Sequence, residues 1–249
     1  MTTADETMTP IVRTRGLLVG HAGRAILPPI DMDFAAGSVT AILGRNGAGK
    51  STLLQTLLGA LPPIEGSIER CRTPLRIALM PQAQKLDFQL PITVREFVSW
   101  GSLVGQGFLR RPWNSATEIE TVETALGALG LTALGNRFLS ELSVGQQQRV
   151  LFARVMATQA DLALLDEPTA AMDLVFQREV MASLQELAKA RSMAVVVVTH
   201  ALSLISQSAE CVLFLDAEAG AVVCGPRAEV MASHAFQRQF GIESTGGGP

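Results

Sequence analysis

Three glycines and a lysine lie between two apolar runs in residues 41–54, AILGRNGAGKSTLL. Glycine costs backbone entropy inside regular structure, so three glycines in six residues need a physical reason. Residues 44–51, GRNGAGKS, match the pattern G-x-x-x-x-G-K-[ST], follow an expected strand and open an expected helix. Backbone amides of such a loop and the helix N-terminus form a concave anion site. The segment therefore predicts a phosphate-binding loop, with Lys50 reaching the terminal phosphates and Ser51 ligating Mg²⁺.

Two acidic residues, Asp166 and Glu167, directly follow the apolar run LALL at residues 162–165. In open parallel sheets, ligands bind beyond the carboxyl ends of the strands, so both side chains are expected to point toward the nucleotide. Asp166 suits the Mg²⁺ shell of a phosphate-loop ATPase. Glu167 suits the orientation or deprotonation of the attacking water. An acidic loop after a strand is common by itself, but together with the phosphate loop this pair predicts ATP hydrolysis.

Short apolar runs alternate with helical patterns over most of the chain, which predicts an α/β fold built on a mainly parallel sheet. Residues 173–192 show helical spacing, with Asp173 as the expected N-cap. Between residues 86 and 142 the strand pattern fades and amphipathic helical patterns replace it. We predict one domain over residues 10–242, with a core of residues 10–86 and 155–242, a helical subdomain inserted at 87–154, and flexible tails at 1–9 and 243–249.

The composition limits the classes of protein that this chain can represent. With 48% hydrophobic and 17% charged residues, it is typical of a folded globular domain. The formal net charge of −3 argues against a broad basic surface, so no nucleic-acid partner is expected. The three cysteines lie far apart, which favours reduced thiols. The longest strongly apolar run, residues 193–198, is far shorter than a membrane span, and we expect no secretory signal.

The segment LSVGQQQRV at residues 142–150 lies shortly before the acidic strand. It resembles the signature motif of ATP-binding cassette (ABC) ATPases, usually written LSGGQQQR. Other motifs of that family occur in the family's order: Gln82 in LMPQ matches the Q-loop, Asp173 in AAMD the D-loop, and His200 in VVVVTH the switch histidine. The resemblance extends from about residue 12 to residue 242. It implies a phosphate-loop NTPase core of the RecA-like type, with an N-terminal antiparallel β portion and the inserted helical subdomain.

The resemblance also implies an ATPase that uses ATP and Mg²⁺. Its expected catalytic residues are Glu167, His200 and Gln82, and its expected Mg²⁺ ligands are Ser51, Gln82 and Asp166. The residues expected to bind ATP within one protomer are Gly44, Arg45, Asn46, Gly47, Ala48, Gly49, Lys50, Ser51, Thr52 and His21.

The signature segment is expected to form a second anion site. Ser143 is predicted to cap a helix that begins near Gly145, so that its hydroxyl, the adjacent amides and the helix dipole favour an anion. In the family, this site binds the γ-phosphate held by the phosphate loop of the other protomer. Ser143, Gly145 and Gln146 are therefore expected to contact the partner's ATP, which implies a homodimer with two sandwiched nucleotides.

Two positions depart from the family pattern. Val144 replaces the usual first glycine of the signature, and a β-branched residue there restricts the backbone and adds bulk near the phosphate. We expect this change to weaken the closed dimer. The chain has no tyrosine, and His21 aligns with the aromatic residue that usually stacks on adenine. His21 is either an adenine contact or a solvated loop histidine.

The residues around the Q-loop indicate the kind of transporter that this cassette would energise. Residues 80–101, MPQAQKLDFQLPITVREFVSWG, resemble zinc, manganese and ferrous-iron importers, in which an aspartate precedes a Pro-(Ile/Val)-Thr-Val segment. Siderophore and haem importers share much of the ending at residues 225–242, so they are the alternative, and a non-transport ABC ATPase is a more distant one. The resemblance implies a membrane permease and an extracytoplasmic metal- or chelate-binding protein as partners. It places the chain at the cytoplasmic face of the cell membrane, as a peripheral subunit.

Overall fold

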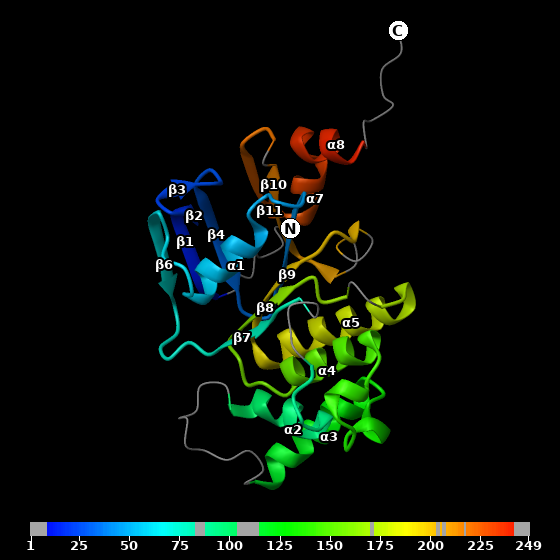
Figure 1. Ribbon diagram of the computed structural model, residues 1–249. Helices are drawn as coiled ribbons and strands as arrows, with labels where there is room; N and C mark the ends of the chain where they lie inside the picture. The colour runs from blue at the N-terminus through cyan, green and yellow to red at the C-terminus, as the bar shows by residue number, and fades with distance from the viewer. Residues whose placement is uncertain are drawn as a thin grey trace, which may run out of the picture.

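In the part of the chain that the structure describes, helices pack against a six-stranded and a three-stranded β-sheet, and a two-stranded hairpin accompanies them (Figure 1). The computed structural model describes residues 9–82, 88–103, 115–169, 172–202, 205, 208–216 and 218–241. Most of the predicted tails, residues 1–8 and 243–249, lie outside these ranges, as do residues 83–87 of the segment after Gln82. Among the helices described, none combines the length and apolar character that crossing a membrane requires.

The larger sheet lies at the centre of the molecule. Its strands are β5 (Val39–Gly44), β7 (Ile77–Met80), β8 (Leu162–Asp166), β9 (Ala194–Val198), β10 (Cys211–Asp216) and β11 (Ala221–Pro226), in the order β11-β10-β5-β9-β8-β7. The five strands from β10 to β7 are parallel, and β11 is antiparallel to its neighbour. Every residue of β5, β8 and β9 is buried, because both faces of the sheet are covered. The predicted α/β class with a mainly parallel sheet is confirmed.

The N-terminal part forms the smaller, antiparallel sheet. In it, β1 (Pro10–Leu18) pairs on one side with β4 (Ile30–Ala35) and on the other with β6 (Glu65–Arg70). Buried and exposed residues alternate along β4, as expected for a strand with one covered face. A short hairpin of β2 (Gly20–His21) and β3 (Arg24–Ala25) follows β1 and carries His21. The predicted antiparallel N-terminal portion is therefore present.

Helices connect many of these strands. They are α1 (Lys50–Leu58), α2 (Val94–Ser99), α3 (Ala116–Ala128), α4 (Val144–Met156), α5 (Leu174–Arg191), α7 (Arg227–Ala232) and α8 (His234–Phe240), with 3-10 turns η2 (Trp100–Leu103), η3 (Thr132–Leu134) and η4 (Leu139–Glu141). In Figure 1, α2 and α3 lie at the bottom of the view, far from the small sheet. One apolar cluster includes Leu126, Phe152 and Val197, so it continues from these helices to the large sheet. The subdomain limits at residues 87 and 154 stay a prediction.

The helix ends follow the local chemistry of the sequence. Asp173 is the N-cap of α5, and its Oδ1 accepts a hydrogen bond of 2.9 Å from the Phe176 amide, as predicted. Gly59 ends α1 in the left-handed conformation, with φ of 87°. Thr93 and Glu96 cap each other reciprocally at the start of α2. These caps fix where the chain enters and leaves the helices around the site.

A buried carboxylate ties the segment before β7 to the start of β8. Asp161 accepts hydrogen bonds from the Arg76 backbone amide at 2.9 Å and from the guanidinium groups of Arg76 and Arg72. Burial opposes ionisation of Asp161, but the hydrogen bonds from Arg76 and Arg72 outweigh it and hold the pKa of this carboxyl below its ordinary value. Because the pKa is lower in the folded state, the stabilisation is complete above the unfolded pKa and is lost as pH falls through the folded one.

We predict that Asp161→Asn lowers the free energy of unfolding at pH 7 by about 1 to 3 kcal/mol, since charge-assisted hydrogen bonds to a buried group are lost. Urea unfolding at pH 7 and at pH 3 measures the effect, and the difference from wild type should shrink at the lower pH. Asp33→Asn is the control, because Asp33 forms solvent-exposed ion pairs with Arg13 and Arg15. This substitution should change the free energy of unfolding by less than about 1 kcal/mol. An equal loss in both variants would contradict the assignment.

Candidate functional site

The loop between β5 and α1 needs glycine at both of its ends. Gly44 closes β5 with φ of 152°, and a Cβ there would lie 2.6 Å from the Leu215 carbonyl oxygen. Gly49 precedes α1 with φ of 89°, and a Cβ there would lie 3.0 Å from Ile26 Cδ1. The backbone therefore makes a tight turn from a buried strand into the N-terminus of a helix, which is the context that a phosphate loop requires. Helix α1 has no acidic residue in its first turn.

Lys50 is buried inside this loop. Its Nζ donates hydrogen bonds of 2.8 Å to the carbonyl oxygens of Gly44 and Arg45. Burial lowers the pKa of Lys50, while the nearby carboxylates of Glu167 and Asp166 raise it less strongly. A phosphate beside the ammonium would offset the cost of burying its charge. The loop is thus prepared for an anionic ligand.

Asp166 and Ser51 bring two oxygen ligands together from distant parts of the chain. Asp166 ends β8 and is buried, and Ser51 Oγ donates to its Oδ2 at 3.2 Å. Mg²⁺ takes oxygen ligands and usually keeps one or two from the protein, with the rest from water and phosphates. A hydroxyl and one carboxylate next to a phosphate loop fit a Mg²⁺–nucleotide, and Gln82 lines the same cleft.

Glu167 has an unusual backbone conformation at the end of β8. Its φ is 50°, in the left-handed region that non-glycine residues seldom occupy, at a cost of about 1 to 3 kcal/mol. Its amide donates to the Val198 carbonyl at 3.0 Å, and its Oε1 lies 3.0 Å from Nε2 of His200. Both side chains are partly exposed, so water can reach them. The strained turn and the histidine together hold a carboxylate at the open edge of the sheet.

Lys50, Ser51, Asp166 and Glu167 line one cleft of about 460 Å³, whereas Gly44, Arg45, Ala48 and His200 are not among its lining residues. His21 stands at its rim, with Nε2 at 3.1 Å from Thr52 Oγ1. The exposed side chain of Ile26 also lines the cleft, and sequence reasoning missed it. The signal that the sequence offered for this position was an apolar residue, isoleucine, shortly after His21. The lining residues are His21, Ile26, Asn46, Gly47, Gly49, Lys50, Ser51, Thr52, Gln82, Asp166 and Glu167.

The signature residues and Asp173 are not part of this lining. Ser143 is the N-cap of α4, and it forms a reciprocal capping box with Gln146, through hydrogen bonds of 3.3 and 3.0 Å. Helix α4 begins at Val144, one residue earlier than expected, and like α1 has no acidic residue in its first turn. Its N-terminus therefore has the features of an anion site that the cleft of the same chain does not use.

Val144 does not occupy a conformation that needs glycine. It is the first residue of α4, its φ is not positive, and its side chain is 59% exposed. Valine can therefore occupy this position without a left-handed backbone. What Val144 adds is an apolar side chain on the surface beside the helix N-terminus, and its effect on a closed dimer stays a prediction.

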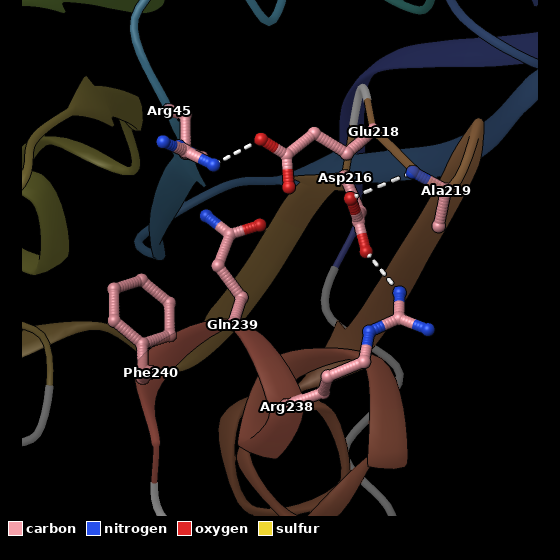
Figure 2. A pocket seen from close by; sticks show the side chains of 7 residues that line it. All are labelled: Arg45, Asp216, Glu218, Ala219, Arg238, Gln239 and Phe240. Atoms are coloured by element: carbon pink, nitrogen blue, oxygen red, sulfur yellow. Dashed lines mark hydrogen bonds and ion pairs between the residues drawn. The ribbon is translucent and has the colours of Figure 1, made fainter.

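A second, larger hollow of about 710 Å³ lies beside the phosphate loop (Figure 2). Its charged groups are already paired: Arg45 with Glu218, and Arg238 with Asp216 at 2.7 Å. Burial opposes ionisation of Asp216, but hydrogen bonds from the Ala219 amide and Arg238 lower its pKa. The hollow therefore offers no unpaired cation to a phosphate, and the smaller cleft is the better nucleotide site. The larger hollow is lined by Arg45, Asp216, Glu218, Ala219, Arg238, Gln239 and Phe240.

The parallel sheet, the phosphate loop and the acidic strand end define a phosphate-loop nucleoside triphosphatase. Within that class, residues 27–170 match the family model described as ABC transporter. This match covers more than half of the chain, so the chain belongs to the ABC transporter family. Cassettes of this family bind ATP with Mg²⁺ and hydrolyse it, and the chain is accordingly an ATPase.

Relatives with known names resemble the chain over nearly its whole length. The zinc import ATP-binding protein ZnuC of Ruegeria sp. (strain TM1040) is 36% identical over 95% of this chain and 88% of the relative. The hemin import ATP-binding protein HmuV of Nocardia farcinica is 37% identical over 87% of this chain and 78% of the relative. A solved chain of a metal-chelate type ABC transporter in an inward-facing conformation superimposes with a TM-score of 0.79 and 31% identity, over 94% of this chain and 90% of that one.

We predict that Lys50→Ala weakens ATP binding by at least about tenfold, because a charge-assisted contact to phosphate contributes about 1.5 to 3 kcal/mol. Calorimetric titration with Mg²⁺–ATP measures the dissociation constant. Lys189→Ala is the matched control, since Lys189 is exposed and its nearest acid is Glu210, at 4.0 Å. An unchanged dissociation constant in Lys50→Ala would overturn the assignment of the loop.

Proposed function

We propose that this chain is the ATP-hydrolysing subunit of an ABC importer, which energises uptake of a transition metal ion, zinc, manganese or iron, through a separate membrane permease. The observation that carries the hydrolytic part is the contact of Glu167 with His200 at the edge of the phosphate-loop cleft. The importer part is supported by the names of relatives that match nearly the whole chain.

Each residue of the cleft has a role in this proposal. Lys50 and the loop amides hold the β and γ phosphates, and His21 with Ile26 forms the apolar rim where the adenine would lie. Glu167 accepts a proton from the attacking water, and His200 holds that water in line with the γ-phosphate. Mg²⁺ on Ser51, Asp166 and Gln82 would neutralise phosphate charge as it develops. The 3.0 Å contact between Glu167 and His200 supports the pairing of these two roles.

We further propose a homodimer in which the N-terminus of α4 binds the ATP of the other protomer. Ser143, Gly145 and Gln146 would supply the contacts, and Asp173 would lie at the interface. Exposed apolar side chains support an interface here: Val144 begins α4, and Leu174 and Val175, which are 61% and 68% exposed, begin α5. Arg149 of α4 stacks on Phe176 of α5 at 3.8 Å, so the start of α5 packs against the N-terminal half of α4. Such a patch is unusual on a surface that stays in water.

The permease is proposed to dock beside the Q-loop, on the surface around α2. Leu90 precedes α2 and Trp100 follows it, and both side chains are exposed. The subunit would thus be peripheral, at the cytoplasmic face of the membrane, and an extracytoplasmic binding protein would deliver the cargo to the permease. The names of the import relatives support this assembly.

Haem or iron-chelate import is the alternative cargo. The zinc and hemin relatives have nearly equal identity to this chain, 36% and 37%. The zinc relative is covered more fully, 88% against 78% of its length. The Pro-Ile-Thr-Val segment at residues 91–94, in which Thr93 caps α2, also favours the metal importers by resemblance. We therefore rank a free metal ion above a chelate.

Glu167→Gln keeps the shape of the side chain but removes its charge. We predict that ATP affinity persists while hydrolysis falls by about 10²- to 10⁴-fold, the usual effect of losing a general base. An ATP-bound dimer should then accumulate on gel filtration, which Lys50→Ala should not give. His200→Ala should resemble Glu167→Gln. Phosphate release and gel filtration, measured on the same variants, test whether Glu167 is the general base. Near-wild-type turnover in Glu167→Gln would contradict that role.

The cargo is tested in the source cell. We expect deletion of the gene to lower cellular zinc, manganese or iron, measured by elemental mass spectrometry, and the wild-type gene but not the Glu167→Gln variant to restore it. Growth with haem or a ferric chelate as the only iron source is the second arm. A defect confined to that arm would favour the alternative cargo, and normal levels of all three metals with normal growth would contradict both.

A further inference from the structure

Three consecutive glutamines in α4 have three different partners. Gln146 caps its own helix, and Gln147 Nε2 donates to the Leu139 carbonyl at 3.2 Å. Gln148 is buried, and its Nε2 donates to the carbonyl oxygens of Glu167, at 3.4 Å, and of Pro168. Both partners of Gln148 are acceptors, so only the NH₂ end of its amide can bind them. Of the three glutamines, Gln148 alone reaches the turn of the catalytic glutamate.

This turn is strained and is held by side chains from several elements. Glu167 has φ of 50°, and its amide is bonded to Val198 of β9. On the far side, Gln177 of α5 donates to the carbonyls of Thr169 and Met172, at 2.9 and 2.8 Å. A left-handed residue persists only where its surroundings fix it. Gln148 binds the carbonyl of the strained residue itself, which sets the plane of the peptide that follows Glu167.

We propose that Gln148 is a positioning residue for ATP hydrolysis, which holds the backbone of Glu167 in its left-handed conformation and so keeps the carboxylate against His200. The inference rests on the proposed role of Glu167 as the base. If Gln148 is removed, the peptide after Glu167 can rotate toward a more common conformation. The carboxylate would then leave the place where the attacking water has to be, while the phosphate loop would stay intact.

The position of Gln148 in α4 adds a consequence. It lies five residues after Ser143, or about 7.5 Å along a helix with a rise of 1.5 Å per residue. The N-terminus of the same helix is the proposed contact with the partner's ATP. A movement of α4 on that nucleotide would therefore be transmitted by the Gln148 amide to the glutamate that acts on the chain's own ATP. One side chain would connect the two nucleotide sites of a dimer.

The test compares Gln148→Met with Gln147→Met in the full-length chain. Each variant replaces one glutamine of α4 by a methionine of similar length and so removes one side-chain amide. Only Gln148→Met removes a hydrogen bond to the Glu167 turn. We expect kcat for Mg²⁺–ATP to fall at least about tenfold in Gln148→Met, with KM within about twofold of wild type, and both constants to stay within about twofold in Gln147→Met. Thermal unfolding of each variant reports whether the fold persists. Gln148→Leu, which has no hydrogen-bond donor, replaces Gln148→Met if that protein is unstable.

A double-mutant cycle separates positioning from general support of the fold. In the Glu167→Gln background, single-turnover hydrolysis should not fall further when Gln148→Met is added, because the group that Gln148 positions is already missing. A further loss by the same factor as in wild type would overturn the inference, as would a Gln148→Met enzyme no slower than Gln147→Met. The Glu167→Gln variant by itself tests whether Glu167 is the general base. A wrong proposed function would therefore show in that single variant, and a wrong inference about Gln148 would show in the Gln148→Met variants.

Discussion

The parallel pairing of three buried strands is the constraint on which the site depends. In the large sheet, β9 lies between β5 and β8, and Val198 of β9 is in register with both Ile42 and Asp166. The carboxyl ends of the strands therefore meet at one edge, where the chain continues as the phosphate loop, the Glu167 turn and the segment of His200. A shift of one residue would exchange the faces of a strand. Both faces are apolar and packed, so the register that fills the core also assembles the site.

Features that depend on neighbours in the chain could be predicted from the sequence. The phosphate loop, its flanking strand and helix, and the N-cap Asp173 each follow from residues a few positions apart, and the structure confirms their geometry. The acidic pair was placed correctly at a strand end because four buried residues precede it. The proximity of His200 to Glu167 came from the family resemblance, since no pattern in either segment indicates that they meet.

Features that depend on tertiary contacts could not be predicted in this way. Gln148 reads as a polar helix residue until the fold brings it to a carbonyl 19 positions later. The bond between Asp161 and Arg76 spans 85 positions, and its strength depends on burial that the sequence does not reveal. The sequence predicted that α4 begins near Gly145, whereas Val144 is its first residue and has an exposed side chain there. In each case the missing information was the environment of the side chain.

Acidic residues in the first helical turn divide the helices into two groups. The first turns of α2, α3 and α7 contain Glu96, Glu118 and Glu229, which stabilise these helices through the dipole, whereas α1, α4, α5 and α8 have none. Of these four, α5 has the carboxylate of Asp173 at its N-cap. In the proposed dimer, the N-termini of α1 and α4 would each face a nucleotide phosphate, which would take the place of the missing carboxylate. Ligand that binds only the native state stabilises it in proportion to the logarithm of its concentration. If both helices bind nucleotide as proposed, the folding stability of this ATPase would depend on the nucleotide level of the cell, and loss of nucleotide would loosen the two helices that hydrolysis requires.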